Sequence, residues 1–418
     1  MSRRLRVAYL MRYLPAPTET FVLDEAAALR ASGAWVQTWM LDRDSEAVRH
    51  GRHESFYSAA RVVPRPSSVR CVLSSLGMET RANYPQVHQN WVRHARMRDL
   101  RRVAWLAGSW KRARIDVVRV HHAAETARYA VAAALLARLP VSLAVHARDL
   151  FVPVPDLSWI LRASNHVTTI TPFHRDRLLR LGLPSQRVEL LACPVAIPDQ
   201  VVSTPASDGP LRILSVGRLI AKKGHDLTLE ACGALARSGV QVEITLVGDG
   251  RERETLTDFA DVLSRDTGGA LKVDLVGMKS AEWIENRLER SRYHAAVLAC
   301  RVDREGDRDG VPVALLEAQA RGLPVVTSAL PGFDFEFSAE GGAVLLPLYD
   351  RAGAVEPSAG DLVACLGALY NDPAYQRRLA QAARLSAEER MSWEQTGLEL
   401  QRMLLGLCSN MLPPGAPS

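Results

Sequence analysis

The segment Leu211–Gly224, LRILSVGRLIAKKG, decides the fold. Its first six residues form an apolar run typical of a buried strand, and Gly217 then opens a turn. A helical pattern follows at 226–237. Strand, turn and helix in this order make up the repeating unit of an α/β fold with parallel strands.

The same alternation recurs on both sides of this segment, and a Pro/Gly-rich linker at 194–210 separates the two series. The pattern predicts two tandem doubly wound α/β domains, with ligands expected at the carboxyl ends of the strands. We expect domains at 1–200 and 201–385, and a C-terminal helix at 386–412 that packs back on the first. The predicted strands are 5–11, 35–40, 116–120, 141–146, 166–170, 188–191, 211–216, 242–247, 271–276, 295–299 and 324–327, and the predicted helices are 19–31, 124–138, 172–181, 226–237, 252–263, 281–290 and 312–321.

Composition indicates a folded chain with several cores. The chain has 418 residues, 47% of them hydrophobic and 23% charged. Its six cysteines lie far apart, without zinc or disulfide spacing, so a cytoplasmic setting is expected. The longest apolar tract, at 129–147, is interrupted by Arg138 and Pro140, so no membrane-spanning helix is expected.

Charge is divided unevenly along the chain. Residues 1–200 contain 29 Lys/Arg against 16 Asp/Glu, whereas residues 201–418 contain 23 against 30. The part from Arg61 to Arg119 is the most basic, and Trp91, Trp105 and Trp110 lie within it. These residues suit an anionic membrane surface, or else a solvated helix whose tryptophans face the core. Nucleic acid is not expected as a partner, because no recognition module accompanies the charge.

Two strand ends in the second half carry candidate anion-binding residues. After the quoted strand, Arg218 and Lys223 stand before a helix, where a phosphate is favoured. The neighbouring strand 242–247 ends in Gly248-Asp249-Gly250. Surface turns explain each segment equally well, and neither a Rossmann nor a P-loop pattern is present.

A third segment, 307–318, combines carboxylates with a helix start. Gly310 allows close approach of the backbone, and Pro312 suits the first turn of a helix. Asp309 and Glu317 lie eight residues apart, and Glu317 stands in an otherwise apolar helix. Such a carboxylate needs a partner, for which ligand hydroxyls are one choice and solvent the other.

Together these segments resemble the donor-binding domain of family-four glycosyltransferases, which have the GT-B fold of two Rossmann-like domains facing a cleft. The resemblance rests on the order VGRL-x-x-KKG, GDG and DGVPVALLEAQARGLPVV. The first half resembles the branch of that family that acts in bacterial exopolysaccharide assembly, including enzymes of colanic-acid type. Its matching stretches are PTETFV at 17–22, VHARDLF at 145–151 and TTIT at 168–171.

The resemblance implies a metal-independent, retaining hexosyltransferase that needs no cofactor, because the nucleotide-diphosphate sugar is its substrate. Arg218 and Lys223 would bind the diphosphate, Glu317 the ribose and Asp309 the donor sugar, while His146 would face the reacting sugar. The backbone around the nucleotide would come from Gly217, Gly248, Gly250, Gly310, Val311 and Pro312. The acceptor would be a glycan or a polyprenyl-diphosphate-linked sugar at the inner face of the cytoplasmic membrane, and the product a cell-surface polysaccharide or glycoconjugate.

Three positions depart from the family pattern. Asp309 stands where the family usually has Glu, Phe333–Phe337 form a bulkier turn, and Pro194-Val195-Ala196 replaces Gly-Val-Asp. A GT-B protein that binds nucleotide sugars without turnover therefore stays open as an alternative, as does a sugar-nucleotide epimerase. Without the resemblance, His146 would be read as an ordinary core or turn histidine.

Overall fold

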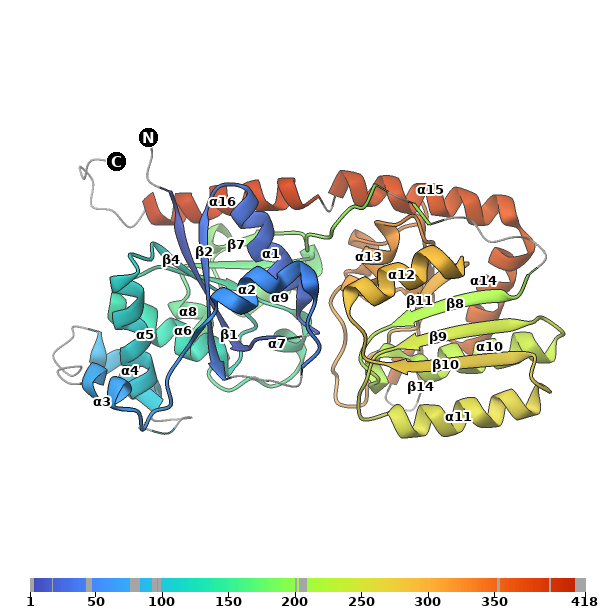
Figure 1. Cartoon of the computed structure of the whole chain (residues 1–418), viewed down its shortest axis with the longest axis horizontal. Helices are drawn as coiled ribbons and strands as arrows, with labels where there is room; N and C mark the ends of the chain where they lie inside the picture. Colours follow the sequence, from blue (N-terminus) through green and yellow to red (C-terminus); the bar gives the residue numbers. More distant parts are fainter. Residues whose placement is uncertain are drawn as a thin grey trace. The chain divides into compact units, whose positions relative to one another are not determined.

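The computed structural model shows two compact units (Figure 1). Unit 1 comprises Met1–Pro194 and Trp393–Ser418, and unit 2 comprises Val195–Ser392. The structure describes residues 4–16, 18–42, 47–75, 83–91, 96, 99–199, 201–202, 209–351, 354–390 and 392–409. The chain therefore passes from unit 1 to unit 2 at 194/195, whereas the linker composition suggested 200/201.

Unit 1 is built on a seven-stranded parallel sheet in the order β3-β2-β1-β4-β5-β6-β7. Alternate residues of β1 enter different cores: Ala8 and Leu10 join one cluster, whereas Val7 and Tyr9 join the other. Both faces of the sheet are thus covered, as expected for a doubly wound fold. The strands are β1 (Arg6–Tyr13), β2 (Trp35–Asp42), β3 (Arg61–Val62), β4 (Val117–His121), β5 (Val141–Ala144), β6 (His166–Thr169) and β7 (Val188–Leu190).

Helices cover the two faces of this sheet. The Ala-rich α6 is buried along almost its whole length, because small side chains allow it to pack closely between its neighbours. The helices of unit 1 are α1 (Thr20–Ala31), α2 (Glu54–Ala59), α3 (Val69–Ser75), α4 (Tyr84–Trp91), α5 (Leu100–Arg112), α6 (Glu125–Ala137), α7 (Ala147–Phe151), α8 (Leu157–Ala163), α9 (Pro172–Arg180) and α16 (Trp393–Ser409).

Unit 2 repeats this design with a six-stranded parallel sheet in the order β10-β9-β8-β11-β12-β13. The predicted class, two tandem doubly wound domains, is confirmed. The strands are β8 (Leu211–Val216), β9 (Val242–Val247), β10 (Leu271–Gly277), β11 (Ala295–Leu298), β12 (Val325–Ser328) and β13 (Ala343–Leu346), with a hairpin of β14 (Tyr349–Arg351) and β15 (Ala354–Glu356). The helices are α10 (His225–Arg237), α11 (Arg253–Asp266), α12 (Ala281–Ser291), α13 (Val313–Gln319), α14 (Ala359–Asn371) and α15 (Pro373–Arg390).

The strand order reverses direction once in each sheet, between β1 and β4 in unit 1 and between β8 and β11 in unit 2. Loops that leave the two central strands there diverge to opposite faces. A crevice opens at such a point beyond the carboxyl ends of the strands, and ligands of doubly wound folds bind there. Each unit therefore offers one preferred place for a site.

The C-terminal segment differs from the single helix expected at 386–412. Instead, α15 ends at Arg390 in unit 2, and α16 begins at Trp393 in unit 1. Ser392, directly before α16, is a residue type that commonly starts a helix, a signal the prediction did not use. Residues 410–412 and Met391 lie outside the described residues. Within α16, Leu400, Met403 and Leu404 are buried in the core that includes α1, whereas Leu398 is exposed.

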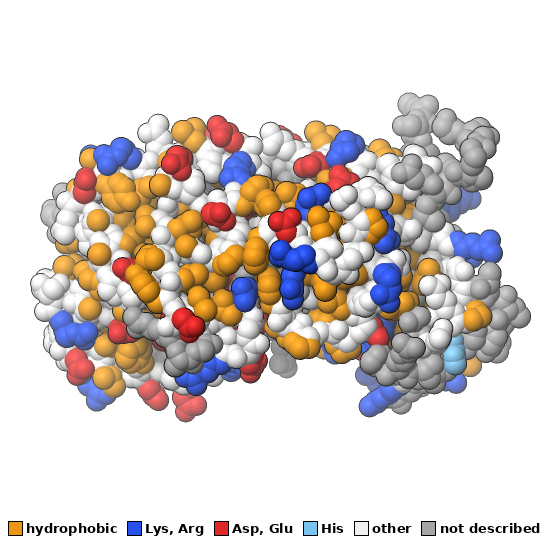
Figure 2. Space-filling view, turned by 180° about the vertical axis from the view of Figure 1, so that it is seen from behind, with side chains coloured by type: hydrophobic (Ala, Val, Ile, Leu, Met, Phe, Trp, Pro, Cys, Tyr) orange, Lys and Arg blue, Asp and Glu red, His pale blue; other side chains and the backbone are white. Residues whose placement is uncertain are grey.

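The tryptophans of the basic segment face the interior. Trp91 and Trp110 are 0% exposed and Trp105 is half-buried, and Leu100, Val103 and Leu106 are also buried. Of the two interpretations of this segment, the helix with a core-facing apolar side is the one observed. On the face drawn in Figure 2, Lys and Arg side chains form separate clusters among apolar and acidic ones. None of the helices in the described part of the chain combines the length and apolarity needed to cross a membrane.

The packing of α16 on α1 predicts opposite effects for two glycines of the same helix. A Cβ atom at Gly397 would lie 2.3 Å from the Ala28 carbonyl oxygen, whereas a Cβ at Gly406 would meet nothing within 4 Å. Gly397→Ala should therefore lower the free energy of unfolding by about 1–3 kcal/mol. Gly406→Ala should raise it by up to about 1 kcal/mol, because Ala favours helix. Urea unfolding measures both, and equal effects would contradict the close contact.

Candidate functional site

In unit 2, the loops after β8 and β11 meet at the point where the strand order reverses. The loop after β8 carries Arg218 and Lys223, and the loop after β11 carries Asp309. Gly224 holds the two loops together: its φ is +66°, and a Cβ there would lie 1.9 Å from the Ala299 carbonyl oxygen. Only glycine satisfies both conditions.

Two lysines converge on one carboxylate in this crevice. Lys223 Nζ lies 2.6 Å from Asp309 Oδ2, and Lys222 Nζ lies 3.4 Å from Asp309 Oδ1. Burial alone would raise the pKa of Asp309, but Lys223 and Lys222 lower it to about 2. Asp309 is therefore ionised at any physiological pH.

Lys222 was not among the predicted site residues, and it has a supporting role. Its ammonium is almost completely buried and also reaches Asp307 Oδ1 at 3.0 Å and the Arg308 carbonyl oxygen at 3.2 Å. A buried lysine of this kind fixes the loop that presents Asp309. The sequence signal was the pair Lys222-Lys223, of which only the second was chosen.

Arg218 has an exposed position at the same strand end. Its carbonyl oxygen lies 3.2 Å from His225 Nε2, and the other ring nitrogen of His225 lies 3.1 Å from the Ser215 hydroxyl. Burial and Lys223 lower the pKa of His225 to about 4, so this histidine is neutral at pH 7. The positive charge of Arg218 contributes to the low pKa of Asp309, which places both groups in one electrostatic site.

Two of the predicted glycines, Gly248 and Gly250, allow neighbouring loops to pack closely. A Cβ at Gly248 would lie 1.9 Å from the Gly217 carbonyl oxygen, and a Cβ at Gly250 would lie 2.4 Å from the Leu219 carbonyl oxygen. The backbones after β8 and β9 therefore approach each other too closely for any side chain at these two positions. At Gly217 an added Cβ would make only ordinary contacts, with Lys223 and His225.

The segment from Gly310 to Glu317 forms the far side of the loop after β11. Val311 and Pro312 are buried. Pro312 was predicted in the first turn of the helix, but it precedes α13, and its carbonyl oxygen accepts from the Leu315 N–H. Glu317 is half-buried in α13, and its carbonyl oxygen accepts from Arg321 Nη1 at 3.1 Å.

The bulky turn after β12 belongs to the core. Phe333 and Phe337 are 1% and 0% exposed, and their ring centroids are 5.8 Å apart. Two of the three phenylalanines that distinguish this turn from the family pattern therefore fill the interior of unit 2, whereas Phe335 is 37% exposed.

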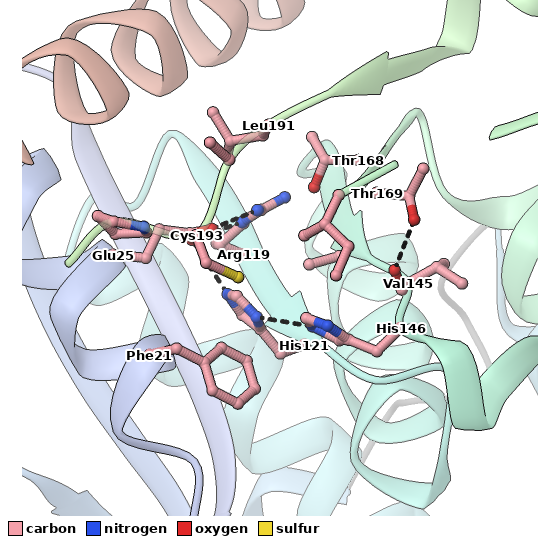
Figure 3. A pocket seen from close by; sticks show the side chains of 14 residues that line it. Phe21, Glu25, Arg119, His121, Val145, His146, Thr168, Thr169, Leu191 and Cys193 are labelled. Atoms are coloured by element: carbon pink, nitrogen blue, oxygen red, sulfur yellow. Dashed lines mark hydrogen bonds and ion pairs between the residues drawn. The ribbon is translucent and has the colours of Figure 1, made fainter. Parts of the chain in front are cut away.

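Unit 1 contains a separate, partly open pocket at the carboxyl ends of β4, β5 and β6 (Figure 3). His146 lies in it, and its ring centroid is 5.1 Å from that of Phe21 and 5.4 Å from that of His121. Burial, with His122 and His121 nearby, lowers the pKa of His146 well below its ordinary value. A neutral imidazole therefore faces the pocket.

A buried polar network underlies this pocket. Glu25 Oε1 lies 3.0 Å from His121 Nε2, and His121 Nδ1 lies 3.2 Å from His146 Nε2. Arg119 donates to both oxygens of Glu25, from Nε at 2.9 Å and from Nη2 at 2.7 Å. Burial would raise the pKa of Glu25, but Arg119 and His121 hold it well below the usual range.

Glu25 and Arg119 were not predicted as site residues. Each is a charged residue within an apolar element, α1 or the fully buried strand β4. Two opposite charges in such positions indicate a buried pair, because an unpaired buried charge is too costly. That signal was present in the sequence, but the partners are 94 positions apart, so nothing local linked the two charges.

The predicted site residues thus form two groups. Arg218, Lys223 and Asp309 come together in unit 2, and His146 lies in the pocket of unit 1. The first group offers two cations beside an ionised carboxylate, an arrangement suited to a phosphate ester with adjacent hydroxyls. The second offers a neutral imidazole with aromatic and hydroxyl neighbours, suited to a polar, uncharged ligand.

Comparison with known proteins agrees with this geometry. The family model described as glycosyl transferases group 1 matches residues 197–386. The amylovoran biosynthesis glycosyltransferase AmsK of Erwinia amylovora is 35% identical over 167 residues, 39% of each chain. The putative colanic acid biosynthesis glycosyltransferase WcaL of Escherichia coli is 24% identical over 365 residues, 83% of this chain and 88% of WcaL.

Solved structures share the fold along nearly the whole chain. Anabaena HepE, crystallised with UDP-glucose, superimposes with a TM-score of 0.69 at 14% identity, over 96% of this chain and 100% of HepE. The lipopolysaccharide outer core galactosyltransferase WaaB gives a TM-score of 0.62 at 15% identity, over 96% of this chain and 99% of WaaB. The chain therefore has the GT-B fold of two Rossmann-like domains, and residues 197–386 match the model of group 1 glycosyl transferases.

The low pKa of Asp309 predicts a pH-dependent contribution to stability. Because the folded-state pKa is depressed, the stabilisation is present above the unfolded value near pH 4 and is lost as the pH falls towards 2. Asp309→Asn should therefore cost about 2 kcal/mol more at pH 5 than at pH 2.5. Urea unfolding at the two pH values measures this. Asp274→Asn, which removes an exposed partner of Arg287, is the control and should show almost no pH dependence.

Proposed function

We propose that this protein is a glycosyltransferase that moves a hexose from a nucleotide-diphosphate sugar to a glycan or lipid-linked acceptor with retention of anomeric configuration. The observation that carries the proposal is the convergence of Arg218, Lys223 and Asp309 at the β8/β11 crevice of unit 2. Two cations there would bind the diphosphate, and the ionised carboxylate would accept hydroxyls of the donor sugar. Glu317 would hold the ribose, and the backbone of 310–312 would border the nucleotide.

In the proposed reaction, Arg218 and Lys223 offset the charge that develops on the departing nucleotide diphosphate. In the ligand-free protein, Lys223 is held by Asp309, so the ammonium is already oriented when the donor arrives. Asp309 itself is a weak base, because its pKa is lowered to about 2. We therefore propose that the leaving phosphate takes the acceptor's proton, with attack on the same face of the sugar.

The proposed reaction needs no metal ion. Asp303, Asp307 and Asp309 alternate in one loop and resemble a set of ligands for a hard cation. Asp307 and Asp309 are, however, neutralised by Lys222 and Lys223, and Asp303 Oδ1 accepts from the backbone N–H groups of Glu305 and Asp307. The lysines supply the positive charge that a divalent ion supplies elsewhere.

The acceptor side of the proposal rests on unit 1 and on the relatives. AmsK and WcaL are named for the biosynthesis of amylovoran and colanic acid, both of them polysaccharides. We propose a comparable role in cell-surface polysaccharide or glycoconjugate synthesis on the cytoplasmic side of the membrane. The acceptor would approach the pocket of His146, whose neutral ring contacts the reacting sugar.

Removing the two cations should abolish donor binding while the fold persists. Each charge-assisted contact is worth about 1.5–3 kcal/mol, so Arg218→Ala/Lys223→Ala should weaken nucleoside-diphosphate binding at least 100-fold. Lys272→Ala is the control. This exposed lysine is the second residue of β10, at the amino end of the strand, whereas the proposed site lies at the carboxyl ends. Calorimetric titration with UDP and GDP measures both. Unchanged affinity in the double variant would place the nucleotide elsewhere.

Turnover distinguishes an enzyme from a binding protein. Donors that raise the melting temperature should be hydrolysed or transferred in the presence of EDTA, with the anomeric configuration retained. Binding without turnover would favour the non-catalytic alternative, and a change of the sugar at constant nucleotide would favour an epimerase. Activity that disappears with the chelator and returns with magnesium would contradict metal independence.

We also propose that unit 1 contacts an anionic membrane surface. The contact would be made by α3, because Trp91 and Trp110 are buried in the core. Val69 and Leu73, one helical turn apart, are 72% and 61% exposed. Arg61, Arg65 and Arg70, which are close to them in the sequence, are also exposed. Exposed apolar side chains in a segment rich in arginine suit the headgroup region of a bilayer.

Sedimentation with vesicles tests this surface. Binding should increase with the fraction of anionic lipid and decrease with salt, because each basic residue contributes about 1 kcal/mol near the membrane. Val69→Ser/Leu73→Ser should weaken the binding, whereas Leu398→Ser, at an exposed leucine of α16, should not. Protein that stays in the supernatant at every lipid composition would refute membrane contact.

A further inference from the structure

The polar network below the pocket of unit 1 contains a directed chain from Glu25 to His146. Glu25 is 5% exposed and receives a hydrogen bond from Tyr9 at 2.8 Å as well as two from Arg119. His121 lies between Glu25 and His146, at 3.0 Å from the first and 3.2 Å from the second. In Figure 3 the dashed line joins the two imidazole rings end to end.

Charge balance fixes the protonation of this chain. Glu25 and Arg119 form a buried pair with no net charge, and Arg119 is 0% exposed. A proton added to His121 or His146 would therefore give this neutral pair a net positive charge, and Arg119 would repel it. Burial accordingly lowers the pKa of His121 as well as that of His146. Both rings are neutral at pH 7.

The ionised Glu25 then determines which ring nitrogen of His121, and in turn of His146, donates a hydrogen bond and which accepts one. An ionised carboxylate only accepts hydrogen bonds, so His121 must present its proton on Nε2 towards Glu25. A neutral ring has one proton, so His121 Nδ1 has the lone pair and must accept from His146 Nε2. The remaining nitrogen of His146, Nδ1, then has the lone pair of its own ring.

We propose that Glu25 is a positioning residue that, through His121, keeps the proton of His146 on Nε2 and so makes Nδ1 a hydrogen-bond acceptor. Other polar groups border the ring. The His122 ring centroid is 4.5 Å away, and Asp149 Oδ2 accepts from the His146 backbone N–H at 2.9 Å. In the capping box of α7 the Asp149 backbone N–H in turn points at the His146 side chain, and this contact also requires a lone pair on the ring.

The consequence for the ligand rests on the proposed function. If a sugar reaches His146, the group that meets Nδ1 must donate a hydrogen bond, as a hydroxyl does. A carbonyl or an ether oxygen at the same position would face a second lone pair and be disfavoured. Glu25 would thus select a hydroxyl at a sugar position that it never touches.

The tautomer can be measured in the ligand-free protein. Long-range proton–nitrogen correlation spectra of the full chain, labelled with ¹⁵N-histidine, distinguish the two neutral tautomers and the cation. The signals of His146 are assigned by their loss in His146→Asn. We expect the Nε2-protonated pattern at pH 7.5. A proton on Nδ1, or a doubly protonated ring, overturns the proposal whether or not the protein transfers sugar.

Two variants test the path through His121. His121→Phe retains an aromatic ring beside Phe21 and leaves the Glu25–Arg119 pair in place, but it removes the acceptor for His146 Nε2. We expect the sharp tautomer pattern to change to an average of both tautomers. Tyr9→Phe, the control, removes a donor to the same Glu25 oxygen without touching the chain, and should leave His146 unchanged. An unchanged tautomer in His121→Phe overturns the role of Glu25.

Discussion

Parallel strand pairing at the centre of each sheet is the constraint on which both candidate sites depend. Because β1 pairs with β4 and β8 with β11, each central pair sends its following loops to opposite faces of the sheet. The carboxyl ends of the strands then lie open between these loops. His121 stands at the end of β4, and Gly217 directly follows β8. Polar and charged residues that are far apart in the sequence are thus brought together at the carboxyl ends of the central strands.

A second principle shared by the units is that the carboxylates are balanced before a ligand arrives. Glu25 is balanced by Arg119, and Asp309 by Lys222 and Lys223. Burial alone would raise the pKa of both acids. The two sites differ in exposure: Glu25 and Arg119 are buried beneath the pocket of unit 1, whereas Lys223 and the exposed Arg218 both act on Asp309. We interpret the Glu25–Arg119 pair as a fixed support for His121. We interpret Lys223 as a group that can exchange its contact with Asp309 for one with a ligand.

The sequence predicted the elements of unit 2 from β8 to β12 closely, with β8 and β9 at their observed bounds, because buried parallel strands are continuous apolar runs between turn residues. It missed the elements of unit 2 that follow β12, which are β13, β14, β15 and α14, and the break between α15 and α16. In unit 1 it missed β3, which has two residues, and the helices α2 to α5, α7 and α8. In the site, Arg218, Lys223 and Asp309 were identifiable because motifs mark them. Glu25 and Arg119 were not, since no local pattern reveals a pair that only the fold brings together. Trp91 and Trp110 were ambiguous because charge spacing does not show which face of a helix is buried.

The return of α16 to unit 1 makes unit 2 an insertion within unit 1. The two crossing points lie beside each other, since Val195 and Ser392 form a bridge. During synthesis, α1 emerges before its partner α16, with the whole of unit 2 between them. Unit 2 is continuous in sequence and can complete its core while unit 1 still exposes the apolar face of α1. The core of unit 1 therefore needs α16 before it can close, whichever unit begins to fold first.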